Sequence, residues 1–419
     1  MPGTPHDGAP AHDPQTANDV RPPLWFAPAS AGLVLAIGVL VGLRGFSETI
    51  LAWGRPFWQV TYRSGLIRRG LVGSIFQGVY GGLPSSTQTM LIIQISLLVV
   101  LALLAGFATW LAILVAGART RSHALRLTLL SLPIIGSALF PMLVFTVGYL
   151  DGILLLFAFS CTVLLARGHL WPAVCLASVA PFVHELFLCL WIPIAIFGYS
   201  ALLRRGGTRT WRILLPALLV PFVSSAVVVL FSSRAATSRE LALHVTGTTN
   251  FRAKLLREEF GQSIGFALRR MEPLHSRYWW PTEVAALGYY CWPAILAAVL
   301  YMFWRWEVLD RWAKAALVLA ILSPWASLMV AWDLSRLILL ANALVLMVIL
   351  GLETGLIDEP FGQLRHATVG GLCAATAFAV ALPFMYVYFD RGYYLNNGPL
   401  RWTLMPLLRP VLNSWFHLV

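Results

Sequence analysis

The chain has 419 residues, of which 58% are hydrophobic and only 11% are charged, and its mean hydropathy is +0.75. Several apolar runs are long enough to cross a bilayer, so the composition excludes an ordinary water-soluble domain and predicts an integral membrane protein. The formal net charge is +12, and all but two of the basic side chains are arginines. The five cysteines show no CxxC spacing and no clustering with histidine. We therefore expect no metal and no cofactor.

Residues 1–24 are rich in proline, alanine, aspartate and glycine, without a basic stretch followed by a short apolar core and a cleavage site. This pattern predicts a disordered cytoplasmic tail rather than a signal peptide. We expect residues 25–419 to form a single all-α, polytopic transmembrane domain with about eleven transmembrane helices. The apolar spans lie at 28–45, 87–117, 127–148, 151–166, 213–232, 283–304, 315–331, 334–352 and 368–388, with two more within 170–203.

The segment 170–203 begins and ends at arginine clusters, so it needs an even number of crossings. Two crossings leave only about 14 residues for the first of them, which is below the usual ~17–25. The segment is either a short or tilted hairpin that crosses twice or a re-entrant hairpin. Both alternatives place His184 and Glu185 at the hairpin tip.

Orientation follows from the short loops, where positive charge favours the cytoplasm. Basic residues gather in the loops 118–126, 203–212 and 305–314. These loops share the cytoplasm if the N-terminus is cytoplasmic, which predicts a multi-pass protein of a bacterial inner membrane. The outer side then holds the turns 149–151, 184–185 and 332–336 and the long connections 46–86 and 233–282.

The two long connections carry apolar residues near helical spacing with arginines between them, within 48–80 and from Asn250 to Ile264. This pattern is typical of amphipathic helices that lie in the membrane interface. The stretch 62–73 holds Arg63, Arg68 and Arg69 among small residues, but its glycine spacing matches no nucleotide-binding motif. Its arginines either snorkel to lipid headgroups or clamp a polyprenyl (pyro)phosphate.

Two of the outer turns carry ionisable residues between apolar spans, where such groups need a structural or functional reason. Asp151 is either the N-cap of the following helix or a carboxylate that serves as a general base. His184 and Glu185 either join helices through an internal polar contact or serve as a base and proton relay. Leu188 occupies the position of the second histidine of HExxH, which excludes that zinc motif.

Asp333 and Arg336 stand three residues apart at the start of the tenth span. They form either an N-cap with a local salt bridge or a site in which Arg336 binds a phosphate or carboxylate and Asp333 orients it. Glu48, just after the first span, is a further outer carboxylate with a possible catalytic role.

The layout of spans, a long outer connection, outer carboxylates and outer arginines resembles two classes of bacterial envelope proteins. These are the GT-C glycosyltransferases, which use polyprenyl-phosphate sugars, and the polysaccharide polymerases of the Wzy and EpsG type. Glu48 is the only residue that fits the acidic position of GT-C first outer loops, and the expected Asp-rich motif is missing. Arg68, Arg69 and Arg336 stand where the resemblance to Wzy-type polymerases implies outer arginines.

The resemblance implies transfer of a sugar from a polyprenyl-linked donor on the outer face of the membrane. In that interpretation arginines neutralise the departing phosphate, and Asp151, His184, Glu185 or Glu48 deprotonates the acceptor. Expected partners are the lipid-linked glycan, membrane lipids and other envelope-assembly proteins, and not nucleic acid. The alternative is a transporter or flippase of a lipid-linked or anionic solute, which would hold its polar groups near the membrane midplane.

Overall fold

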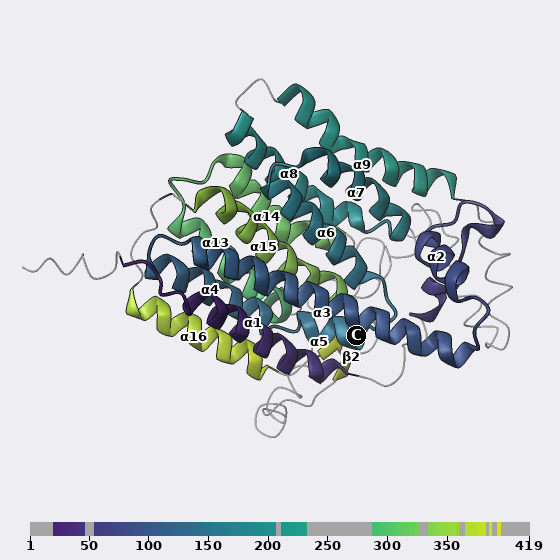
Figure 1. The fold of residues 1–419 in the computed structure, drawn as a ribbon, viewed down its shortest axis with the longest axis horizontal. Helices are drawn as coiled ribbons and strands as arrows, with labels where there is room; N and C mark the ends of the chain where they lie inside the picture. Colours follow the sequence, from purple (N-terminus) through teal and green to yellow (C-terminus); the bar gives the residue numbers. More distant parts are fainter. Residues whose placement is uncertain are drawn as a thin grey trace, which may run out of the picture.

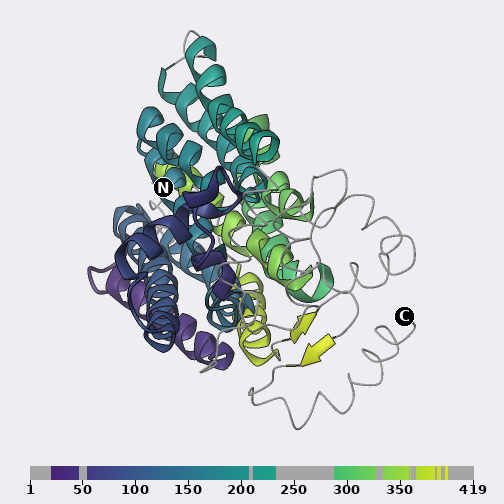
Figure 2. The same cartoon turned by 90° about the vertical axis from the view of Figure 1, so that its right-hand side faces the viewer.

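The computed structural model describes residues 20–46, 54–206, 211–232, 287–326, 334–357, 359, 365–382, 385–387 and 392–394. These residues form a bundle of packed helices (Figures 1 and 2). Residues 1–19 of the predicted tail, Glu48, Asp333 and the connection 233–282 lie outside the described residues. Residues 20–24 of the predicted tail are described, and the backbone carbonyl of Val20 accepts the N–H of Arg121 at 3.0 Å.

Most helices of the described residues coincide with predicted apolar spans, but two predictions are wrong in part. The predicted span 127–148 is divided into two helices, and the predicted span 368–388 is helical only to Ala381 and contains a strand at 385–387. In chain order the helices are α1 (Phe26–Gly42), α2 (Gly70–Tyr80), α3 (Ser85–Gly117), α4 (Arg121–Ile135), α5 (Leu139–Phe145), α6 (Asp151–Ala166), α7 (Leu170–Val183), α8 (Phe187–Gly206), α9 (Trp211–Phe231), α13 (Trp292–Trp304), α14 (Arg311–Ala326), α15 (Leu334–Leu356) and α16 (His366–Ala381). Short 3-10 turns lie at Leu43–Gly45, Arg55–Trp58 and Tyr62–Ser64, and a π-helical turn at Leu287–Cys291 leads into α13. The strands β1 (Met385–Val387) and β2 (Gly392–Tyr394) form a small antiparallel sheet.

Within the described residues, five helical segments are long and apolar enough to cross a membrane, or six if the bent pair α4 and α5 is one span. The five are α1 with its 3-10 extension, α3, α8, α9 and α15. The helices α6, α7, α13 and α16 are apolar but shorter. The structure thus supports a helical membrane protein, whereas the predicted count of about eleven crossings is not confirmed.

The central helix of the bundle is α15, which packs against α6, α8, α13 and α14. It is almost entirely buried, because its residues from Leu339 to Leu350 are apolar on every side except at Asn342. The helices α1 and α16 lie along one edge in Figure 1 and α9 along the opposite edge. The peripheral helices expose large apolar side chains such as Leu98, Leu230 and Phe378, as lipid-facing helices do.

The helical path is interrupted between α4 and α5, and the side chain of Asn342 in α15 forms hydrogen bonds at this interruption. Its side-chain amide donates to the carbonyl of Tyr290 at 2.7 Å and to the hydroxyl of Ser137 at 3.3 Å. Its carbonyl oxygen accepts the N–H of Ala294 at 3.2 Å. The amide therefore satisfies polar groups that the break and the start of α13 would otherwise leave buried without partners.

The basic loops gather at one end of the bundle, which we call the basic end. Arg204 pairs with Asp310 at 3.0 Å, and Arg205 donates to the carbonyl of Ala166. The described residues of the predicted outer turns, Asp151, His184, Glu185 and Arg336, lie at the other end. Helix α7, with 14 residues and a length of about 21 Å, runs from the basic end to His184 at that other end. The hairpin 170–203 thus extends between the same two ends as its neighbours.

The segment 54–80 does not form the single amphipathic helix that its periodicity predicted. It begins with 3-10 turns, and α2 starts only at Gly70, because Gly65 and Arg69 adopt positive φ angles of 132° and 62°. The side chains of Phe57, Trp58 and Ile67 are at most 3% exposed. These three side chains therefore insert into the bundle end, whereas Ile75 and Val79 of α2 are exposed.

Candidate functional site

Six polar residues from four separate parts of the chain meet at the end of the bundle opposite the basic end. We call them the arginine–carboxylate cluster: Arg68, Arg69, Asp151, His184, Glu185 and Arg336. They come from the turn before α2, the start of α6, the turn between α7 and α8, and the start of α15. Hydrogen bonds and ion pairs between residues far apart in the sequence connect these turns.

The turn before α6 is anchored to the segment 54–80. Gly148 has a φ of 93°, a conformation that side chains disfavour, and its carbonyl accepts the indole N–H of Trp58 at 2.7 Å. The hydroxyl of Tyr62 donates to the carbonyl of Phe182 at 3.3 Å, at the end of α7. Burial raises the pKa of Tyr62 to about 12, so this phenol stays protonated as a donor.

Arg69 and Glu185 form a two-point ion pair across the two turns. The Nη2 of Arg69 lies 2.7 Å from Oε1 of Glu185, and its Nε lies 3.1 Å from Oε2. The same guanidinium lies 5.3 Å from the ring centroid of Phe57. The paired fork and carboxylate geometry fixes the orientation of both side chains.

Arg336 and Asp151 form the second ion pair, with 3.2 Å between Nε and Oδ2. Both side chains are buried, and the guanidinium carbon lies 4.5 Å from the ring centroid of Tyr149. The sequence-based alternative of Asp151 as an N-cap is wrong, because α6 begins at Asp151 itself and its N-cap position is Leu150. The carboxylate is thus directed to Arg336 while it still lies in the positively polarised first turn of α6.

His184 lies between the two ion pairs and is 2% exposed. Its Nδ1 accepts the N–H of Leu186 at 3.1 Å, which assigns the ring proton of the neutral imidazole to Nε2. Burial, followed by the charge of Arg69, holds the pKa of His184 well below its ordinary value, and Arg336 adds to this effect against the opposing effect of Glu185. His184 is therefore neutral near pH 7.

Glu185 is ionised over the whole physiological range. Burial alone would raise the pKa of its carboxyl, but the charges of Arg69 and Arg68 and the hydrogen bond from Arg69 bring that pKa well below its usual range. A carboxylate with so low a pKa is a weak base. The structure therefore favours a role for Glu185 in orienting Arg69 and not a role as a proton acceptor.

The six described residues of the cluster include three guanidiniums, two carboxylates and the neutral imidazole of His184, in mostly buried surroundings. Arginine forks suit phosphate and carboxylate groups, and their charge acts strongly where water is scarce. The arrangement is suited to binding an anion at the end of the bundle.

The structure brings six of the nine predicted site residues together. Of the other three, Arg63 is exposed and belongs to the 3-10 turn that precedes the cluster. Glu48 and Asp333 lie outside the described residues. The roles assigned to the nine residues stay predictions.

A second buried ionic network, which the apolar and basic patterns of the sequence do not predict, lies toward the basic end. Arg305 donates from Nε and Nη2 to Oε1 and Oε2 of Glu353 at 2.9 and 2.8 Å. The same carboxylate contacts Nε2 of His123 at 2.8 Å and accepts the hydroxyl of Tyr301 at 2.7 Å. Nearby, the fully buried guanidinium of Arg126 lies 4.9 Å from the ring centroid of Trp304.

The sequence assigned Arg126 and Arg305 to exposed cytoplasmic loops because they flank apolar spans. The available signal was Glu353, an acidic residue inside the apolar stretch 334–356 that needs a partner. Since α15 carries Arg336 near its start and Glu353 near its end, the cluster and this second network are about 25 Å apart along one helix.

Among the residues that the structure describes, no group of three or more histidine, cysteine, aspartate or glutamate side chains has the arrangement of a metal site. The chain matches no protein-family model, no curated protein and no solved structure in the comparisons with known proteins.

Proposed function

We propose that the protein is a glycosyltransferase or polysaccharide polymerase that transfers a sugar from a polyprenyl-linked donor on the outer face of a bacterial inner membrane. The observation that carries this proposal is the convergence of Arg68, Arg69 and Arg336 at one end of an apolar bundle, beside the carboxylates of Asp151 and Glu185. A lipid-linked sugar offers a phosphate to such arginines and an apolar chain to the surrounding lipid.

The proposed topology has about eleven crossings and a cytoplasmic N-terminus. The basic loops at one end of the bundle and the cluster at the other support this orientation. The shorter helices, α7 among them, then serve as short or tilted crossings. Membrane lipids and other envelope-assembly proteins are the further partners we propose.

In the proposed reaction the acceptor hydroxyl attacks the anomeric carbon of the donor sugar. The bond from that carbon to the phosphate oxygen breaks, and the polyprenyl (pyro)phosphate leaves with the electron pair. The arginines lie ready to stabilise the charge that develops on this leaving group. Arg336 binds the phosphate in place of Asp151, and the released Asp151 carboxylate accepts the proton of the acceptor hydroxyl.

The other predicted catalytic residues take different roles in this scheme. Glu185 holds Arg69 in position, because it forms a two-point ion pair and has a low pKa. His184 donates from Nε2 to the sugar or phosphate instead of acting as a base. Glu48 is retained as the alternative base.

A transporter or flippase of a lipid-linked or anionic solute is the second candidate. It is favoured by the buried polar side chains at three levels of α15, namely Arg336, Asn342 and Glu353. Such a series along a central helix resembles the polar groups that mark solute pathways through membrane proteins.

Purified full-length protein in proteoliposomes distinguishes the two functions. The liposomes carry polyprenyl-pyrophosphate-linked oligosaccharide as donor and acceptor, and the products are separated by chain length. Longer lipid-linked or released glycans support the transferase. Movement of the lipid-linked glycan between leaflets without any glycosidic product contradicts the transferase and supports the flippase.

A further inference from the structure

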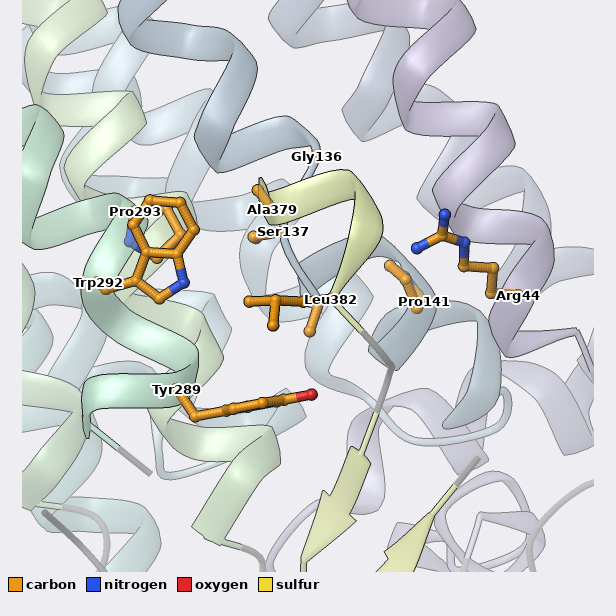
Figure 3. Close-up of a pocket in the computed structure, with 10 residues that line it drawn as sticks. Arg44, Gly136, Ser137, Pro141, Tyr289, Trp292, Pro293, Ala379 and Leu382 are labelled. Atoms are coloured by element: carbon orange, nitrogen blue, oxygen red, sulfur yellow. The ribbon is translucent and has the colours of Figure 1, made fainter. Parts of the chain in front are cut away.

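A small pocket, open on one side, lies at the break between α4 and α5, apart from the arginine–carboxylate cluster. It lies between α1, α5, α13 and the end of α16 (Figure 3). Its principal side chains are Arg44, Ser137, Tyr289, Trp292 and Leu382. None of the residues that line it belongs to the cluster.

The fold builds this pocket from interrupted helices. The chain turns at Gly136–Ala138, and α13 starts after a π-helical turn that contains Tyr289. Asn342 holds both interruptions through Ser137 and the carbonyl of Tyr290. The pocket wall is therefore fixed by buried hydrogen bonds rather than by mobile side chains alone.

One wall of the pocket carries a positive charge. Arg44 is half-buried in the 3-10 turn after α1, next to the exposed side chains of Leu43 and Phe46. Among the described residues no carboxylate forms an ion pair with Arg44. An arginine at the end of an apolar helix places its guanidinium near the level of the lipid headgroups, where its planar fork suits a phosphate. In Figure 3 its charged group extends toward the pocket.

The opposite wall is aromatic and leads to an apolar outer surface. The hydroxyl of Tyr289 points into the pocket in Figure 3. The ring of Trp292 lies 5.4 Å from that of Phe378, which is 51% exposed on α16. Tyrosine and tryptophan commonly stand at the boundary between lipid headgroups and acyl chains. The pocket thus offers a cation and hydroxyls on the inside and an apolar exit.

We propose that this pocket binds the phosphate headgroup of a membrane lipid, with the phosphate on Arg44 and one acyl chain along Trp292 and Phe378. The inference does not depend on the proposed glycosyl transfer, because it rests on a different set of residues. Inorganic phosphate shares the chemistry that Arg44 recognises, so the experiment includes both sources of phosphate.

The test is native mass spectrometry of the full-length protein in detergent, titrated with dioleoylphosphatidic acid. Dioleoylglycerol, which lacks the phosphate, and inorganic phosphate are the comparison probes. Arg44→Ala should weaken phosphatidic acid binding by about 10-fold to 100-fold, the loss expected for charge-assisted hydrogen bonds. Arg44→Lys should lose less, because it keeps the charge but not the fork.

The matched control is Arg167→Ala, which removes an exposed arginine at the basic end. It should leave binding unchanged. A second test variant, Leu382→Glu, adds a carboxylate to the pocket and should also reduce binding, and thermal unfolding of each variant verifies its fold.

Wild-type affinity in a folded Arg44→Ala or Leu382→Glu protein overturns the proposal. Equal affinity for dioleoylglycerol also overturns it, since the phosphate would then contribute nothing. If inorganic phosphate competes with phosphatidic acid at equal concentration, the pocket is a free-anion site and not a lipid site.

Discussion

Glu353 is the carboxylate whose loss should destabilise the bundle most. Both of its oxygens are fully buried, and together they contact Arg305, His123 and Tyr301. Replacement by glutamine keeps the shape but removes the charge. It also places an amide donor against guanidinium or imidazole donors.

The expected loss of unfolding free energy depends on Arg305, the partner that remains after Glu353 is replaced. Arg305 is 1% exposed, so Glu353→Gln removes the carboxylate paired with a guanidinium in the interior. Breaking a buried ion pair by removal of one partner costs about 3–5 kcal/mol of unfolding free energy. The exposed residue Glu307 offers a matched control on the neighbouring loop, where Glu307→Gln should change that free energy by less than about 0.5 kcal/mol. Replacing both partners, as Arg305→Met with Glu353→Leu, should recover part of the loss.

The assay is reversible unfolding of the full-length protein in mixed micelles with increasing denaturing detergent, followed by circular dichroism. A loss below about 1 kcal/mol for Glu353→Gln, or a double variant less stable than the single one, would contradict a stabilising role for this ion pair.

Three further predictions concern the end of the bundle that holds the cluster. Gly73→Ala should lower the unfolding temperature measured by circular dichroism, because an added Cβ meets the carbonyl oxygen of Val60, whereas Gly78→Ala, with open space around it, should not; equal temperatures would contradict this packing. Acidification should lower thermal stability. The pKa of Glu185 is lower in the folded protein than in the unfolded chain, so its stabilisation is complete above the unfolded value of about 4.5 and is lost as the pH falls below it. The lowered pKa of His184 also reduces stability as the pH falls below about 6.5. An unfolding temperature that rises between pH 7 and pH 4 would contradict both assignments. Arg69→Lys should reduce sugar transfer less than Arg69→Ala, because the ammonium keeps the charge but loses the two-point geometry; equal rates for the two variants in the proteoliposome assay would argue against that geometry.

The sequence predicted the features that depend on short stretches of residues, namely the positions of the helices and of charged residues in turns. Apolar runs predicted the helices because a membrane span needs a continuous apolar stretch. Isolated charges in turns pointed to Asp151, Glu185 and Arg336, and the structure brings these turns to one end of the bundle. The pairing itself depends on tertiary packing, so the sequence could suggest Asp333 for Arg336 but not Asp151.

The remaining differences also have physical causes. Helical periodicity in 48–80 could not reveal the positive φ angles at Gly65 and Arg69, which delay α2 to Gly70. The buried network around Glu353 was hidden because flanking arginines normally indicate a cytoplasmic loop. Their side chains instead point into the bundle, where Arg126 lies over the ring of Trp304 and Arg305 pairs with Glu353.

The most direct test of the proposed function is the initial rate of sugar transfer in proteoliposomes by Arg336→Ala, compared with wild type and with Arg167→Ala. We expect wild-type transfer in Arg167→Ala and a loss of about 10²-fold to 10³-fold in Arg336→Ala, the scale for removing one preorganised group that stabilises developing charge. Transfer at the wild-type rate by a folded Arg336→Ala protein would contradict the assignment of the arginine–carboxylate cluster as the site of the reaction.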